Sequence, residues 1–166
     1  MFNKVAIFVS VVVIVVLGFF VYRKYFVLND IHYHAGFRVF LDGAQEDFSG
    51  PQYMSLAPCS DQNLQEDEQL EKAHLHDRNG HIVHVHRDGA HWKDLFRNIH
   101  YPIEGKGSIT AYINGNRVAN ILEEPIQPYE SVIILIGKHG DPKTYLQKAV
   151  TRREIIAAEK KSEDCH

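Results

Sequence analysis

Histidine occupies alternate positions at three places in this chain, with an apolar or aromatic residue between the two members of each pair. The three pairs are His32 and His34, His74 and His76, and His84 and His86. Because residues i and i+2 of a β-strand point to the same face, each pair directs two imidazoles to one side of a sheet. This alternation predicts three strands, each with a histidine face and an apolar face.

Two of the pairs fall in one predicted hairpin, over residues 72–87, whose turn contains Asn79 and Gly80. A type I turn with a bulge, in which Gly80 adopts the left-handed conformation, pairs His74 with His84. The apolar members then share the opposite face, where we expect them to be buried: Ala73, Leu75, Val83 and Val85. A register shifted by one residue would bury one histidine pair and expose one apolar pair.

The four imidazoles of this hairpin predict a metal site. His74 and His84 face each other, whereas His76 and His86 lie at opposite corners, more than about 10 Å apart at the backbone. The natural ligands are therefore His74, His84 and one corner, or else two sites share the face. Neutral imidazole suits Zn²⁺ and Cu²⁺, and the pattern offers no oxygen cage for Ca²⁺ or Mg²⁺.

The first histidine pair extends this hypothesis. If the strand expected over residues 31–41 lies beside or over the hairpin, His32 and His34 can complete a site. The alternative is that histidine simply fills the polar strand faces. Three acidic residues are candidate bases or hydrogen-bond partners, at positions that the spacing does not fix: Glu71, Asp77 and Glu104.

An apolar run near the N-terminus predicts a membrane segment. Residues 5–22 carry no charge, and Arg23 and Lys24 follow them. At about 1.5 Å rise per residue, the run nearly spans a hydrocarbon core of about 30 Å. No small-residue cleavage site follows, so we predict an uncleaved transmembrane signal-anchor and tether over residues 1–29; a buried core helix is the alternative.

The chain has two cysteines, Cys59 and Cys165, and no Cys-x-x-Cys pair. Two distant cysteines in loop or tail context favour one structural disulfide in an oxidising compartment. Two free thiols, or a weak metal-binding end at Cys165 and His166, are the alternatives. The anchor and the cysteines predict a single-pass protein of the cell membrane with an extracytoplasmic domain. The positive charges of Arg23 and Lys24, which follow the apolar run, favour instead a domain on the cytoplasmic side.

Charge and missing motifs exclude several functions. Three of the 18 basic residues and none of the 21 acidic ones lie in residues 1–29, so the remainder has a net charge of −6. Such a domain repels nucleic acid, and no protein partner is indicated. The chain lacks Gly-x-Ser-x-Gly, phosphate-loop, dinucleotide and His-Glu-x-x-His motifs, so no catalytic residue is identified.

The remaining pattern predicts an α+β fold. A helix is expected at 91–99, strands at 108–113, 117–122 and 131–136, and a further helix from 141 to about 161. The order of hairpin, helix, strand and late central strand is that of a β-grasp domain, with the hairpin at 72–87 and the strand at 131–136 in the corresponding places. The expected fold is thus a β-grasp-like mixed sheet with one packed helix. To it are added a hairpin over residues 30–50, the N-terminal transmembrane helix and a C-terminal helix.

The predicted domains are the anchor and tether (1–29), a His-rich α+β domain (30–140), and a C-terminal helix and tail (141–166). Several segments together resemble an uncharacterised family of membrane-anchored, His-rich proteins of candidate-phyla bacteria: 32–37, 47–49, 74–77, 83–86, and Trp92 with Phe96. The likeness covers most of residues 30–165 and implies the location and the disulfide rather than a chemistry. Locally, His74 and His76 with His84 opposite are similar to the zinc ligand layout of α-type carbonic anhydrases.

Three functions remain open at this point. The first is a membrane-tethered extracytoplasmic metal-binding protein, a copper or zinc carrier, buffer or sensor that uses the six paired histidines. The second is a zinc-dependent hydrolase or hydro-lyase with three histidines and one water at the ion. The third is a structural or adhesion module whose histidines are incidental or sense pH.

Overall fold

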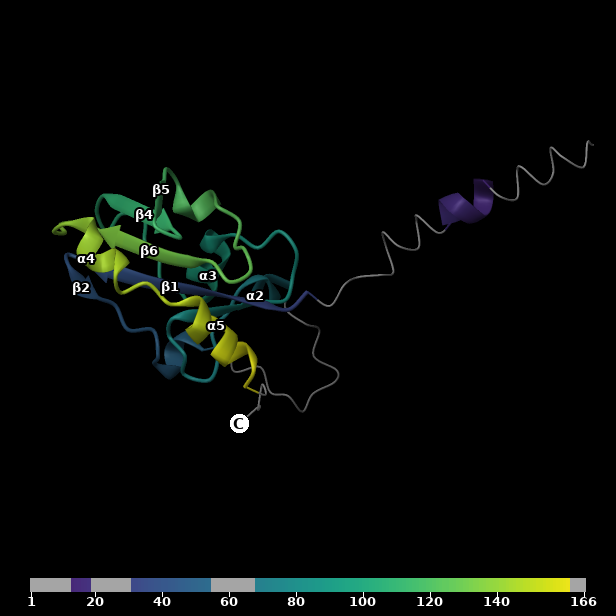
Figure 1. Ribbon diagram of the computed structural model, residues 1–166, viewed down its shortest axis with the longest axis horizontal. Helices are drawn as coiled ribbons and strands as arrows, with labels where there is room; N and C mark the ends of the chain where they lie inside the picture. Colours follow the sequence, from purple (N-terminus) through teal and green to yellow (C-terminus); the bar gives the residue numbers. More distant parts are fainter. Residues whose placement is uncertain (1–12, 19–30, 55–67, 162–166) are drawn as a thin grey trace, which may run out of the picture. The chain divides into compact units, whose positions relative to one another are not determined.

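The structure is a computed structural model that describes residues 13–18, 31–54 and 68–161 (Figure 1). The chain divides into two compact units, Met1–Ile31 and His32–His166. All six histidines of the His-x-His pairs belong to the second unit. Both cysteines of the predicted disulfide lie outside the described residues, and no disulfide forms among the residues that the structure describes.

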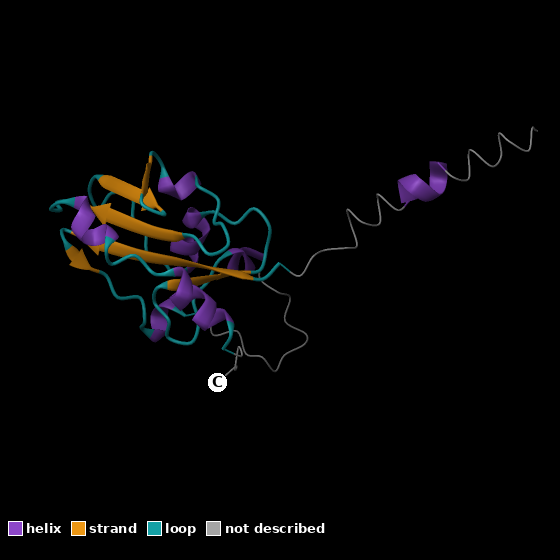
Figure 2. Ribbon diagram, in the orientation of Figure 1, coloured by secondary structure: helices purple, strands orange, loops and turns teal. Residues whose placement is uncertain are grey.

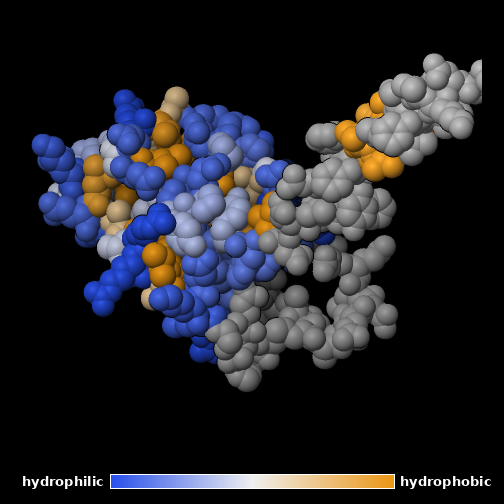
Figure 3. Space-filling model, turned by 45° about the vertical axis from the view of Figure 1, so that its right-hand side comes forward, coloured by the Kyte–Doolittle hydropathy of each residue, from blue (hydrophilic) through white to orange (hydrophobic). Residues whose placement is uncertain are grey.

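The first unit corrects a prediction. Residues 13–18 are helical, and the large hydrophobic side chains of residues 13–17 are exposed (Figure 3). Within the described part of the chain, no helix combines the length and the apolar composition needed to cross a membrane. The predicted transmembrane helix, the membrane as a partner and the extracytoplasmic single-pass location are contradicted for these residues and are not carried further.

The second unit is built on a six-stranded mixed sheet (Figures 1 and 2). The strands are β1 Tyr33–Leu41, β2 Ala44–Gln45, β3 Ile82–Val85, β4 Ile109–Ile113, β5 Asn116–Val118 and β6 Ser131–Ile136. Their order is β2-β1-β6-β4-β5, with β3 also paired to β1. The β1–β6 pair is parallel and the others are antiparallel. One edge of the long strand β1 thus pairs with β6, and the other pairs with β3 and then β2.

Helices cover both faces of this sheet (Figure 2). They are α2 Glu68–Lys72, α3 Trp92–Asn98, α4 Pro142–Leu146 and α5 Arg152–Glu159, with short 3-10 turns η1 Pro51–Tyr53 and η2 Ile121–Glu123. The main core joins one sheet face to α3. On the other face, Phe40 packs with Tyr145 of α4, and Ile82 packs with Ile155 of α5. The sheet is therefore a middle layer between α3 and the C-terminal helices.

The predicted faces of the second hairpin are confirmed. Its four apolar side chains are fully buried in the main core together with the α3 residues Trp92 and Phe96: Ala73, Leu75, Val83 and Val85. Burying a Val or Leu side chain stabilises a fold by about 1.5–3 kcal/mol. His74 pairs with His84 across the hairpin, as the register predicts. The histidine pairs therefore point away from this core.

The predicted placement of the hairpins is wrong. The hairpin formed by β1 and β2, rather than that of residues 72–87, lies beside the central strand β6. Residues 72–87 instead add to the outer edge of β1 through β3 alone, and residue 74 contributes only an isolated bridge. Alternation determines which face a side chain takes, but it does not determine which strand edges pair. The fold class is corrected to a mixed α/β domain with this six-stranded sheet.

Two local expectations also change. The left-handed residues of the second turn are Asp77 (φ 56°) and Arg78 (φ 53°), whereas Gly80 is not left-handed. Gly80 is needed because a Cβ there would collide with the backbone of Phe48 and Ser49. The expected long C-terminal helix is split into α4 and α5, because Thr151 caps a new helix by accepting a hydrogen bond from the Glu154 amide.

Candidate metal centre

The histidine face is assembled from three neighbouring backbone segments. The strand β3 lies in the middle, where His84 pairs with His34 of β1 on one side and with His74 on the other. Tyr33 of β1 pairs with Val85 of β3, so His32 and His86 follow in the next register position. Paired residues share a face, so β1, β3 and the segment around residue 74 present all three His-x-His pairs on one side of the sheet.

The imidazole rings pack closely against one another. His84 is the central ring, with its centroid 3.5 Å from that of His76 and 4.0 Å from that of His34. The rings of His32 and His86 are stacked at 4.6 Å, and those of His74 and His86 at 5.2 Å. The six predicted residues therefore form one continuous group, which we call the histidine cluster.

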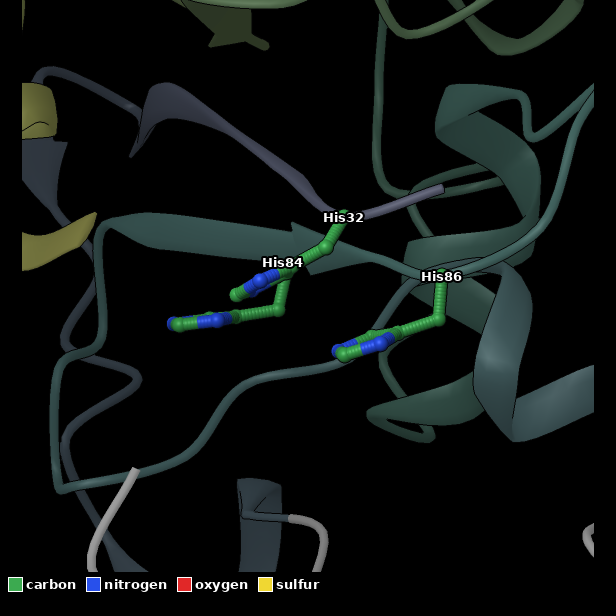
Figure 4. Close-up of side chains that lie close together, drawn as sticks. All are labelled: His32, His84 and His86. Atoms are coloured by element: carbon green, nitrogen blue, oxygen red, sulfur yellow. The ribbon is translucent and has the colours of Figure 1, made fainter. Parts of the chain in front are cut away.

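Three members of the histidine cluster can hold a metal ion. His32, His84 and His86 each offer one ring nitrogen, and these nitrogens all lie within 4.8 Å of one another. Figure 4 shows the three rings extending in the same direction, from the backbone just before β1 and from β3 and its continuation. His84 is only 4 % exposed, His86 is half-buried and His32 is exposed. The group thus runs from the interior of the histidine face to its surface.

Burial keeps the central ring uncharged. Desolvation is the largest cause that lowers the pKa of His84, and positive charge on His76, His34, His74 or His32 would lower it further. A lowered pKa means that the neutral imidazole persists at pH values where an exposed histidine gains a proton. Neutral imidazole is the form that binds metal ions.

Hydrogen bonds and one ion-pair contact hold several of the rings. His76 Nε2 lies 2.7 Å from His84 Nδ1, and His76 Nδ1 lies 2.9 Å from the Asp77 carboxylate. His74 Nδ1 lies 3.0 Å from the Leu70 carbonyl oxygen, at the end of the cluster next to α2. Each contact holds a ring at Nδ1, and such contacts orient histidines that bind metals.

Acidic residues meet the cluster at two points. The Glu71 carboxylate of α2 lies 4.0 Å from His86 Nδ1, and Asp77 contacts His76 as described above. Both were candidates in the sequence, whereas no contact of Glu104 with the cluster is observed among the described residues. The Leu70 carbonyl was not predicted, because the helix α2 that presents it falls where the sequence indicates a loop.

The structure brings the predicted residues together in a different grouping. The pairing of His74 with His84 is confirmed, and the two corners His76 and His86 do not share the ligand group. However, His32 takes the place that we expected for His74. The reason is that β1 pairs directly with β3, so the first His-x-His pair enters the same face as the second hairpin.

The fold and the site define a small mixed α/β domain with a histidine cluster that can hold a metal ion. Compared with protein-family models, with curated proteins and with solved structures, the chain finds no match. The resemblance to a family of His-rich proteins stays a prediction. The function proposed below rests on the geometry of the histidine cluster.

Proposed function

We propose that this protein binds Zn²⁺ or Cu²⁺ and acts as a metal carrier, buffer or sensor. The observation that supports this function is the group of three ring nitrogens, from His32, His84 and His86, that lie within 4.8 Å of one another. Six imidazoles in contact on one sheet face form a dense supply of nitrogen donors. Such donors suit Zn²⁺ and Cu²⁺ better than the oxygen-seeking Ca²⁺ and Mg²⁺.

The size of the group fits an ion after a small closure. Bonds of about 2.0–2.1 Å from zinc to imidazole nitrogen place tetrahedral ligands about 3.3 Å apart. Nitrogens separated by up to 4.8 Å must therefore approach by roughly 1.5 Å. His32 is exposed, so rotation of its side chain supplies this closure without repacking the core.

The other three histidines complete the proposed site. His34 meets the ring of His84 edge-on at 4.0 Å, and His74 and His76 lie on its other side. We assign these residues to the outer part of the site, where they orient His84 or replace a ligand as the ion enters and leaves. Exchange among neighbouring imidazoles is the property that a carrier or buffer needs.

The test is calorimetric titration of the full chain, prepared without a His-tag, with Zn²⁺ and with Cu²⁺. We expect one ion per chain, and we expect His84→Ala to abolish tight binding because it removes the central ligand. His32→Ala and His86→Ala should each weaken binding by at least tenfold. The matched control is His100→Asn, which replaces an exposed histidine at φ 55° with the residue that best tolerates this conformation.

Two results would contradict the proposal. Equal, small losses at every histidine, including His100, would indicate diffuse surface chelation rather than a site. A metal content near zero after gentle purification, together with no heat of binding, would favour a structural module with incidental histidines.

A second candidate function is a zinc-dependent hydrolase or hydro-lyase. It is favoured by the ligand count, because catalytic zinc sites commonly have three protein ligands and an open position for water. The exposed His32 puts the open position at the surface. Hydrolysis of an activated ester by the zinc-loaded chain, lost in His84→Ala and kept in His100→Asn, would favour the enzyme over the carrier.

A further inference from the structure

A chain of three polar groups leads from the solvent to the central ligand. The carboxylate of Asp77, on the exposed turn after residue 76, contacts His76 Nδ1 at 2.9 Å. The opposite nitrogen of the same ring, Nε2, lies 2.7 Å from His84 Nδ1. The contact between the two rings is a hydrogen bond, and the carboxylate lies close enough to the other nitrogen of His76 for its charge to act on the protons of both rings.

The carboxylate determines the order of these protons. An ionised carboxylate offers only lone pairs, so the carboxylate 2.9 Å away favours a proton rather than a lone pair on His76 Nδ1. In neutral His76, Nε2 then bears a lone pair and accepts a hydrogen bond. With neutral His76 in this form, the hydrogen bond between the two rings has its proton on His84 Nδ1. A neutral His84 with its proton on Nδ1 has its lone pair on Nε2.

We propose that Asp77 and His76 are positioning residues that hold His84 in the Nδ1–H form and so present Nε2 as the metal-binding atom. This inference gives a residue-level mechanism to the proposed metal site and rests on that function for its purpose. The proton arrangement itself exists without metal. It can therefore be tested separately.

The other end of the cluster repeats the same arrangement. The Leu70 carbonyl oxygen can only accept, so His74 Nδ1 donates the hydrogen bond at 3.0 Å. His74 and His84 are stacked at 6.0 Å with an interplanar angle of 14°. Two nearly parallel rings on adjacent segments thus carry their protons on Nδ1 and their lone pairs on Nε2.

The direct test is ¹⁵N NMR of the histidine side chains in the metal-free full chain. The spectrum is recorded with a chelator, at one pH well above the ordinary histidine pKa of about 6.5. We expect His84 Nε2 to show the shift of an unprotonated ring nitrogen and His84 Nδ1 that of a protonated one. The reverse assignment would overturn the inference, even if the protein binds zinc.

Two substitutions break the chain at different points. Asp77→Gly removes the carboxylate at a left-handed position (φ 56°) that glycine adopts without strain. His76→Leu removes the acceptor for His84 Nδ1. In both variants we expect His84 to shift toward the Nε2–H form, and metal affinity to fall by roughly 10–100-fold, the usual effect of removing a partner of a ligand.

Matched variants separate positioning from folding. Arg78→Gly changes the next left-handed residue of the same turn (φ 53°), which is exposed, and should leave the tautomer and the affinity unchanged. His76→Gln keeps an acceptor near the Nε2 position and should restore the Nδ1–H form. If Asp77→Gly and Arg78→Gly have the same effect, turn flexibility explains the loss and the inference is wrong. If the tautomers behave as expected but no metal binds, only the proposed function fails.

Discussion

At the scale of single residues, the most informative side chain is His84, an imidazole 4 % exposed among four others. A buried histidine adds little to stability when it is neutral, but it resists protonation because the charged form loses its hydration. This property links the stability of the metal-free protein to pH. It also distinguishes a pre-formed neutral ligand from a surface histidine.

The first prediction follows from the lowered pKa of His84. Below the ordinary value of 6.5 the unfolded chain takes up this proton and the folded protein does not, so the free energy of unfolding decreases as pH falls. One such histidine contributes a slope of about 1.4 kcal/mol per pH unit between 6.5 and its folded pKa. Urea unfolding at several pH values, with a chelator present, measures this slope.

The control for this prediction is the variant His84→Gln, whose slope should be smaller by that amount. His81 has a pKa that is lowered by burial and by the Arg38 charge, so its contribution should remain in the variant. An unchanged slope in His84→Gln would show that His84 titrates normally and that the ring is not shielded from water.

At the scale of elements, the position of the second hairpin depends on one close contact. The backbone at Gly80 touches that of Phe48 and Ser49, beyond β2, and a Cβ has no room there. The contact holds the turn of residues 77–80 against the loop that follows β2. The hairpin of residues 72–87, which carries two histidine pairs, is thereby held at two places. Its strand β3 pairs with β1, and its turn contacts the loop after β2.

We therefore predict that Gly80→Ala destabilises the protein by about 1–3 kcal/mol, the usual range for overpacking. The obstructing atoms belong to the backbone, so they cannot rotate away. Gly140→Ala is the control, because nothing lies within 4 Å of a Cβ built at Gly140. Chemical denaturation of both variants measures the difference, and equal stabilities would contradict the prediction.

The sequence predicts correctly which side chains of the second hairpin face the core, but it does not predict which strands pair with each other. The buried set at Val83 and Val85, and the opposite face with His84, follow from alternation, which the backbone preserves wherever the strand is placed. The partnership of β1 with both β6 and β3 depends on tertiary packing that no local pattern encodes. For that reason the sequence predicts His32 as a ligand only if β1 lies beside or over the second hairpin, and its prediction of how the hairpins are placed in the sheet is wrong. By contrast, the Thr151–Glu154 capping box is a local signal, and reading it would have split the C-terminal helix.

At the scale of the whole molecule, the histidine cluster joins segments that are distant in sequence. His32 precedes β1, whereas His84 and His86 lie in and after β3. A metal ion that binds all three therefore connects parts of the chain that come together only in the folded state. Binding to the folded state alone must raise the free energy of unfolding.

The third prediction is the size of that increase. At a free ion concentration 100 times the dissociation constant, one site raises the free energy of unfolding by about 2.7 kcal/mol. Thermal unfolding of the chain with and without Zn²⁺ measures the effect, with His100→Asn as the variant that should respond fully. His84→Ala should show no upward shift. A lower melting temperature with zinc would mean that the ion prefers the unfolded chain.

The parallel pairing of β1 with β6, with Gly36 opposite Ser131, has a consequence for the order of folding. The β4–β5 hairpin closes over a few residues, but β1 cannot pair with β6 until most of the chain is present. Domains whose strands pair across long sequence separations fold slowly. The entropy cost of closing a long loop is incurred before the strand contacts that offset it have formed. During synthesis, all six histidines of the cluster, which lie between residues 32 and 86, are therefore present before β6, and an ion meets all three His-x-His pairs before β1 gains its parallel partner.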